Sequence, residues 1–203
     1  VLLVVQFVFM IPDIIYVLEN TGFDPSWRYF LNVVNGTDLK FGRDIYFTYG
    51  PLGYLFYLMK LPGNTIEYWS GIVIWGIIFL FHLWMLLQLY RLYQKGKIHF
   101  WAITASVCCY LAGYYAPTRD NYLLYLMILA VVLWAKGAKN IVLIPNLLLL
   151  LMFFGKFSTF TSGFAFCILF CIFDVLFRKN WKSIWLFLPG IILMPVCYLV
   201  YCP

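Results

Sequence analysis

The chain has 203 residues, of which 65% are hydrophobic and 11% are charged. A soluble domain is roughly half apolar and about one quarter charged, so this composition excludes a soluble globular fold and predicts an integral membrane protein. The formal net charge is +6, from 14 basic and 8 acidic residues. The apolar runs are continuous and lack the in–out alternation of barrel strands, which favours helices as the spanning elements.

Apolar stretches recur along the whole chain and predict an all-α, polytopic transmembrane bundle with about seven spans. The predicted segments are residues 1–18, 68–90, 100–116, 122–135, 141–154, 157–177 and 184–201. Pro145, Pro189 and Pro195 are expected to end or kink their helices. Residues 1–203 are expected to form a single transmembrane domain. Because both ends fall inside apolar runs, we expect the chain to be a fragment of a longer polypeptide.

Three short connections carry eight basic residues and no acid: Arg91, Lys95, Lys97, Lys136, Lys139, Arg178, Lys179 and Lys182. Short loops rich in Lys and Arg stay in the cytoplasm. The pattern therefore predicts a multi-pass protein with a cytoplasmic N-terminus and with residues 19–67 on the non-cytoplasmic side. The net charge is then a topological signal, and no nucleic-acid partner is expected.

The outer loop, residues 19–67, is predicted to carry two interfacial amphipathic helices. Asp24 followed by Pro25 is typical of a helix start, and Gly36 is typical of a stop. One apolar face lies between these signals, and a second one follows Gly50-Pro51. The tyrosines of this loop fit an aromatic belt at the membrane surface; a platform for a sugar or lipid headgroup is the alternative.

Charged side chains gather at the predicted outer face and form a candidate site for an anionic headgroup: Asp24, Arg43, Asp44, Arg119, Asp120 and Lys156. A carboxylate there can take a proton from an attacking hydroxyl, while Lys and Arg can hold a leaving phosphate. Structural alternatives stay open for each. Asp24 and Asp120 are also suited to helix caps, Arg43 with Asp44 to a local ion pair, and Lys156 to an interfacial anchor.

The layout resembles the membrane glycosyltransferases of the GT-C superfamily, which include protein O-mannosyltransferases and aminoarabinose lipid A transferases. Asp24-Pro25-Ser26-Trp27 resembles the acidic start of that family's first outer loop, Thr118-Arg119-Asp120-Asn121 its second acidic position, and Gly155-Lys156-Phe157-Ser158 its lysine. The stretch 41–53 resembles poorly characterised bacterial members. The chain departs from the family where proline replaces a second acid after Asp24, and later helices and a soluble domain are not in this sequence.

This resemblance implies transfer of a sugar from a polyprenyl-phosphate donor to an acceptor on the non-cytoplasmic face, with membrane lipid as a further partner. Asp24 would be the general base, and Lys156 with Arg119 would hold the donor phosphate. Asp120 would organise the acceptor or a divalent metal, although no cofactor is established. Arg43, Asp44 and Tyr49 form a further loop site. A transporter or flippase and a noncatalytic assembly subunit are the alternatives.

Overall fold

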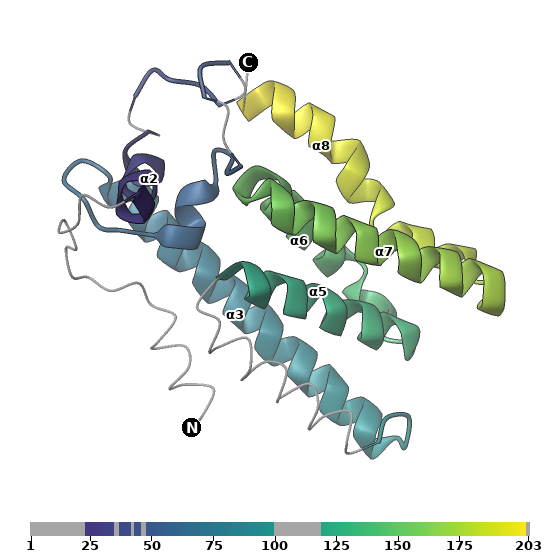
Figure 1. Cartoon of the computed structure of the whole chain (residues 1–203). Helices are drawn as coiled ribbons and strands as arrows, with labels where there is room; N and C mark the ends of the chain where they lie inside the picture. Colours follow the sequence, from purple (N-terminus) through teal and green to yellow (C-terminus); the bar gives the residue numbers. More distant parts are fainter. Residues whose placement is uncertain (1–22, 35–36, 42, 46–47, 100–118, 202–203) are drawn as a thin grey trace.

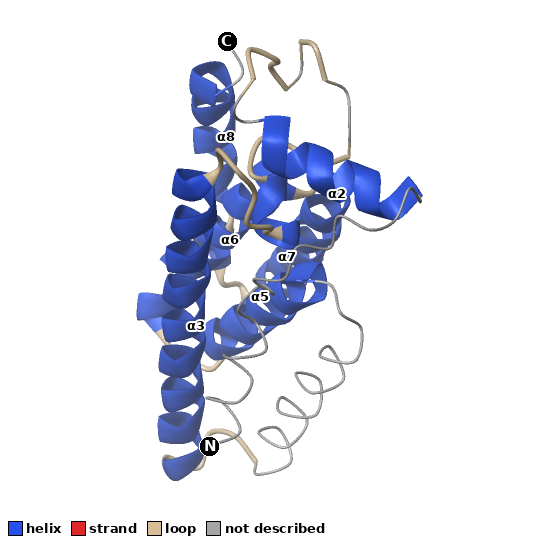
Figure 2. Cartoon of the chain, turned by 90° about the vertical axis from the view of Figure 1, so that its left-hand side faces the viewer, coloured by secondary structure: helices blue, strands red, loops and turns tan. Residues whose placement is uncertain are grey.

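The computed structural model describes residues 23–34, 37–41, 43–45, 48–99 and 119–201. The elements in these ranges are α2 (Phe23–Val33), η2 (Gly53–Tyr57), α3 (Thr65–Gln94), α5 (Arg119–Ala135), η3 (Lys139–Ile141), α6 (Leu143–Gly155), α7 (Phe157–Arg178), η4 (Trp181–Leu186) and α8 (Leu188–Tyr201). The β contacts found there are two isolated bridges. The expected all-α class is confirmed for the described part of the chain (Figure 2).

Within the described residues, three helical segments are long and apolar enough to cross a membrane: Thr65–Gln94, Phe157–Arg178 and Trp181–Leu199. Two shorter apolar helices, Tyr122–Ala135 and Leu143–Gly155, accompany them. The predicted segments 1–18 and 100–116 lie outside the described residues. The count of seven spans therefore stays a prediction, while the apolar helices themselves are confirmed.

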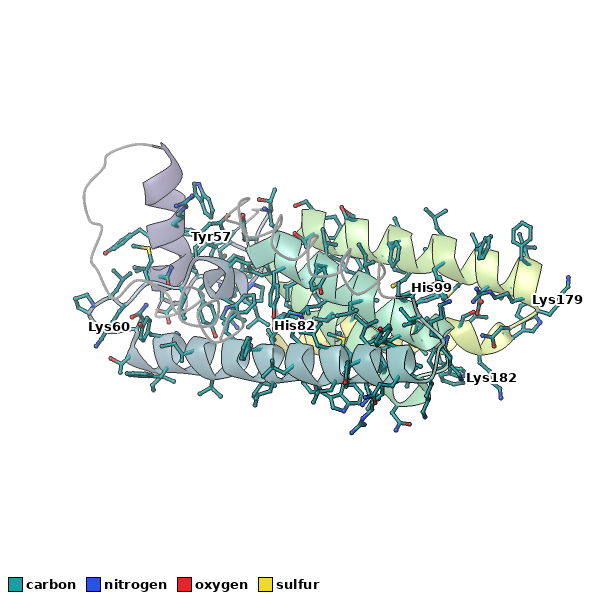
Figure 3. The ribbon with its side chains drawn as sticks, turned by 90° about the horizontal axis from the view of Figure 1, so that it is seen from below. Tyr57, Lys60, His82, His99, Lys179 and Lys182 are labelled. Carbon is teal, nitrogen blue, oxygen red and sulfur yellow. The ribbon has the colours of Figure 1, made fainter. Side chains whose placement is uncertain are left out.

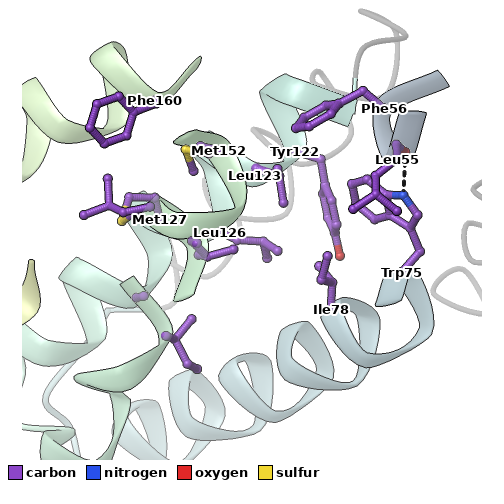
Figure 4. Close-up of a cluster of buried hydrophobic side chains, with 14 of the residues drawn as sticks. Leu55, Phe56, Trp75, Ile78, Tyr122, Leu123, Leu126, Met127, Met152 and Phe160 are labelled. Carbon is purple, nitrogen blue, oxygen red and sulfur yellow. Dashed lines mark hydrogen bonds between the residues drawn. The ribbon is translucent and has the colours of Figure 1, made fainter. Parts of the chain in front are cut away.

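Helix α6 lies at the centre of the bundle. It contacts α5, α7 and α8 (Figure 1), and apart from Asn146 its sequence, LIPNLLLLLMFFG, has no polar side chain, as expected of a helix surrounded by others. Leu149 and Met152 of α6 are fully buried, together with Leu123 and Met127 of α5. Figure 4 shows part of this core, which continues through Trp75 of α3 to η2.

Helices α3, α5 and α7 run in one direction through the bundle and α6 and α8 in the other, which gives it two distinct ends (Figure 1). We call one the loop end, because it carries α2, η2 and the α6–α7 junction. We call the other the basic end, because α3, α5 and α7 terminate there and the three basic connections follow them. Figure 3 shows Tyr57 and Lys60 at the loop end, and Lys179 and Lys182 at the basic end. The basic connections thus share one end of the bundle, as the charge pattern predicted.

Three helices stop at the basic end with a residue in the left-handed region. After α3 and α5 this residue is a glycine, Gly96 with φ 65° and Gly137 with φ 97°. After α7 it is Lys179, with φ 55°. Glycine is the usual residue in this conformation, because a Cβ makes it unfavourable. The lysine is therefore the exception among the three.

Two of the three prolines begin helices rather than ending them. Pro145 is the third residue of α6 and Pro189 the second of α8, in the first turn, where the backbone needs no N–H donor. Pro195 lies inside α8. The predicted segments 141–154 and 184–201 are both interrupted shortly before these prolines, at Val142 and at Phe187, so each proline marks the start of an α-helix rather than its end. The apolar run in the sequence extends past each helix start and conceals it.

Buried Asn146 fixes the α6–α8 contact. Its amide donates to the carbonyl oxygens of Val142 (2.8 Å) and Trp185 (2.9 Å), and its Oδ1 accepts from the Gly190 N–H at 2.7 Å. A Cβ on Gly190 would lie 3.1 Å from that Oδ1. Small residues that allow close approach, combined with a polar side chain, are typical of helix packing in membranes.

Candidate functional site

The site at the loop end is built on a break between two apolar helices. Lys156 separates α6 from α7 with an extended backbone, φ −140° and ψ 111°, and it forms an antiparallel bridge with Tyr49. Three backbone hydrogen bonds flank this bridge: Gly50 N to Gly155 O (3.0 Å), Leu52 N to Phe154 O (2.9 Å) and Phe157 N to Thr48 O (3.0 Å). They satisfy polar groups that the interrupted helix leaves without intrahelical partners.

Two glycines allow the loop to lie directly on the junction. A Cβ on Gly50 would be 2.5 Å from the carbonyl oxygen of Phe154, and a Cβ on Gly155 would overlap the Phe56 ring. Neither position has room for a side chain without movement of a neighbour. The residues are glycines because backbone and ring approach here more closely than a methyl group permits.

Aromatic rings from α2, the loop and η2 meet beside the junction. Trp27 stacks on Tyr49 with ring centroids 5.0 Å apart and an interplanar angle of 21°. Tyr57 meets the Trp27 ring edge-on at 4.6 Å. The hydroxyls of Tyr49 and Tyr57 lie 3.3 Å apart. Rings held by several partners form a rigid surface at low entropic cost.

Two cations lie over these rings. The Lys156 ammonium is 5.2 Å from the centroid of Tyr49, and the Arg28 guanidinium is 4.8 Å from that of Tyr57 and 5.5 Å from that of Trp27. We call these five residues the cation–aromatic cluster. All three distances are within the range of cation–π attraction, so the cluster concentrates positive charge on an aromatic surface.

Buried side chains fix the elements that carry the cluster. The Asn32 amide donates to the carbonyl oxygens of Arg28 (2.9 Å) and Tyr57 (2.8 Å), and its Oδ1 accepts from Met59 N at 3.0 Å, which ties α2 to η2. Trp75 Nε1 donates to Leu55 O at 2.8 Å (Figure 4) and ties α3 to η2. The cluster is thus attached to both the junction and α3.

The structure brings predicted site residues Lys156 and Tyr49 into contact. The backbones of Asp24, and of Arg119 with Asp120, lie in the first turns of α2 and α5, both of which begin at the loop end. Acidic residues in a first turn are favoured by the helix dipole. The side chains of these three lie outside the described residues, so their predicted roles are not decided.

Arg43 and Asp44 form a local ion pair. Arg43 Nη2 lies 2.6 Å from Asp44 Oδ2, which also accepts from the Lys40 N–H at 2.9 Å. The hydrogen bond from Arg43 and then that from Lys40 lower the pKa of Asp44, while the bond to Asp44 raises the pKa of Arg43. This geometry is the structural alternative that the sequence left open; a further role in a loop site stays a prediction.

An apolar groove lies on the bundle between α3, α5 and α6. Its volume is about 170 Å³, and all its lining side chains are hydrophobic, including Ile74 and Phe81 of α3, Leu126 of α5, and Leu148 and Leu151 of α6. Such a surface suits a hydrocarbon chain rather than a polar ligand. Ile74 adjoins Trp75, which is hydrogen-bonded to η2, so one end of the groove is next to the element that carries Tyr57 of the cluster.

Arg28 was not among the candidate site residues predicted from the sequence. For Tyr57, as for the other tyrosines of the loop, an aromatic belt was predicted, with a platform for a sugar or lipid headgroup as the alternative. No local pattern indicated their contacts with Trp27, because Arg28 follows Trp27 directly and Tyr57 belongs to another element. Within the described ranges, no group of three or more His, Cys, Asp or Glu side chains is placed to hold a metal ion. Comparison of the chain with protein-family models, with curated proteins and with solved structures gives no match.

Proposed function

We propose that this chain is part of a polytopic membrane glycosyltransferase of the GT-C kind, which transfers a sugar from a polyprenyl-phosphate donor to an acceptor. The loop end would face the non-cytoplasmic side and the N-terminus the cytoplasm. The cation–aromatic cluster at the α6–α7 junction carries this proposal, because it combines the two features that a lipid-linked sugar needs. Cations attract the phosphate, and flat aromatic faces accept the apolar side of a sugar ring.

In this proposal Lys156 and Arg28, with Arg119 from α5, hold the phosphate that leaves. Asp24 takes the proton of the acceptor hydroxyl while the hydroxyl oxygen forms a bond with the anomeric carbon of the sugar. The bond from that carbon to the phosphate oxygen breaks, and polyprenyl phosphate is released. The cations stabilise the negative charge that develops on the phosphate. Asp120 orients the acceptor.

Two further features support the orientation and the class of donor. The three basic connections share the end opposite the cluster, and such connections stay in the cytoplasm. One end of the apolar groove is next to η2, the element that carries Tyr57 of the cluster. A donor with its phosphate at Lys156 would have a hydrophobic surface next to the start of its lipid chain.

Binding of polyprenyl phosphate tests the donor site, because this moiety is common to all such donors. The full chain in phosphatidylcholine nanodiscs is titrated with polyprenyl phosphate, and Lys156→Ala is compared with Lys60→Ala, a lysine at the same end outside the cluster. A lost charge-assisted hydrogen bond of about 1.5–3 kcal/mol predicts a loss of roughly tenfold or more for Lys156→Ala. Equal affinity of the two variants for polyprenyl phosphate would refute the assigned phosphate site.

The chemical role of Asp24 requires a transfer assay. Asp24→Asn in the longest natural polypeptide that contains this chain should abolish sugar transfer while donor binding persists, because the amide cannot accept the proton. Wild-type transfer by this variant would refute the assigned base.

Transport is the second candidate, and one observation favours it. His82 of α3 is fully buried and its Nδ1 lies 2.9 Å from the Tyr122 hydroxyl of α5, about midway along α3 (Figure 3). Polar groups near the bilayer midplane are typical of transporters. Movement of polyprenyl phosphate between the leaflets of proteoliposomes, with loss in Tyr122→Phe and without sugar transfer, would select this function.

A further inference from the structure

The turn between α7 and η4 carries positive charge that the nearby carboxylate, Asp174, does not neutralise. Asp174 is 1% exposed, and both its oxygens are occupied, Oδ1 by Arg178 at 3.4 Å and Oδ2 by the Asn180 amide at 2.7 Å. The ion pairs between described residues are Arg43–Asp44 and Arg178–Asp174. Lys179 and Lys182 therefore have no carboxylate partner within the described part of the chain.

Lys179 occupies a backbone conformation that favours glycine. Its φ is 55°, and the contact that closes the helix there is its backbone N–H to Val175 O at 3.1 Å. A glycine would make the same hydrogen bond without the cost of a Cβ. The other two helices that end at this side of the bundle have glycine in that place, Gly96 and Gly137. The lysine side chain thus stands at a position where the backbone favours glycine, and it gives the turn a cation that a glycine would not.

Exposed aromatic side chains surround these lysines. Phe177 is 73% exposed, Trp181 67% and Trp185 56%. Leu176, in the turn before, is exposed as well and continues the apolar outer face of α7. Tryptophan and lysine together at the end of an apolar helix are typical of the zone where lipid headgroups meet the hydrocarbon.

We propose that the α7–η4 turn is a docking site for anionic phospholipid headgroups. Lys179 and Lys182 bind the lipid phosphate, and Trp181 with Trp185 packs beside the glycerol and upper acyl chain. A lipid is the occupant because positive charge and exposed apolar rings alternate within one short segment that continues into an apolar helix face. This site requires insertion in a bilayer with the basic end at a membrane surface, but it does not depend on the sugar-transfer reaction.

Lipid retention tests the proposal. The full chain is placed in nanodiscs with equal amounts of phosphatidylglycerol and phosphatidylcholine and then extracted into mild detergent, and the lipids that remain bound are counted by native mass spectrometry. The wild type should retain phosphatidylglycerol in preference to phosphatidylcholine. Each lysine near a charged surface contributes about a fivefold preference, so Lys179→Gly and Lys182→Ala should each lower it by about that factor.

Lys179→Gly separates binding from folding, because it should raise the midpoint of thermal unfolding while it lowers phosphatidylglycerol retention. Lys60→Ala, at the opposite end, is the matched control and should leave retention unchanged. Equal retention of the two lipids by the wild type, or unchanged phosphatidylglycerol retention in the double variant Lys179→Gly, Lys182→Ala, would overturn the proposal. The same loss in Lys60→Ala would also overturn it, since the attraction would then be general. None of these readouts uses a sugar donor, so they are independent of the transferase proposal.

Discussion

Replacement of Gly50 by alanine should detach the loop from the α6–α7 junction. The new Cβ would lie 2.5 Å from the Phe154 carbonyl oxygen, 3.1 Å from its carbon and 3.4 Å from its Cα. These are backbone atoms of a buried helix, so no side-chain rotation can relieve the contact. The adjacent hydrogen bonds of Gly50 N and Leu52 N, at 3.0 and 2.9 Å, would lengthen when the segments separate.

Overpacking costs about 1–3 kcal/mol and each of the two weakened hydrogen bonds up to about 1 kcal/mol, so we expect Gly50→Ala to lower the free energy of unfolding by about 1–5 kcal/mol. The free energy is measured by titration with sodium dodecyl sulfate in mixed micelles, followed by tryptophan fluorescence. Gly76→Ala is the control, because a Cβ on Gly76 meets nothing within 4 Å.

Gly76 lies inside α3, where alanine is preferred to glycine by about 0.5–1 kcal/mol, so this variant should be at least as stable as the wild type. Gly50→Ala should also weaken polyprenyl-phosphate binding, since Tyr49 would move away from Lys156. If the two alanine variants had the same stability, the close approach of loop and junction would be refuted.

Asn146→Ala removes the hydrogen bonds between α6 and the η4–α8 segment and should lower the free energy of unfolding by about 1–2 kcal/mol. Trp75→Phe removes the donor to Leu55 O and should lower it by about 1 kcal/mol. An unchanged denaturation midpoint of either variant in the same titration would contradict its prediction. Because Arg43 lowers the pKa of Asp44, their pair stabilises the loop at neutral pH, and this stabilisation is lost as the pH falls below 3.8 through the lowered pKa. Hydrogen-exchange mass spectrometry of the loop peptide should show loss of protection in that range, and Asp44→Asn should lack this step.

The apolar pattern predicted the helices well, because membrane-crossing length and composition are local properties. The predicted boundary between residues 154 and 157 coincides with the α6–α7 break, where Gly155 and Lys156 interrupt an apolar run. The pairing of Tyr49 with Lys156 was not predictable from such patterns, because it joins two segments far apart in the sequence. The place of Lys156 between two apolar helices was predicted, but not the rings beneath its ammonium.

The residue types of the candidate site could be predicted from the sequence, but not all of the residues that form it. Charged residue types at predicted helix ends indicated Lys156, and the structure joins it to Tyr49. Arg28 was missed because its role depends on the packing of α2 against η2 through Asn32. Periodicity shows which face of a helix is apolar, but not which neighbouring element covers that face.

The shortness of α6 has a consequence for the depth of Lys156 in the bundle. With 13 residues it is about 20 Å long, against about 30 Å for a typical hydrocarbon core, whereas α3 with 30 residues reaches about 45 Å. Because other helices surround α6, it can end inside the span of its longer neighbours, and in the proposed orientation this would set Lys156 below the level of the outer headgroups. Water would then extend down to the Lys156 ammonium. A dissolved acceptor could therefore meet the donor there while the acceptor stays in water and the lipid chain of the donor stays in the bilayer.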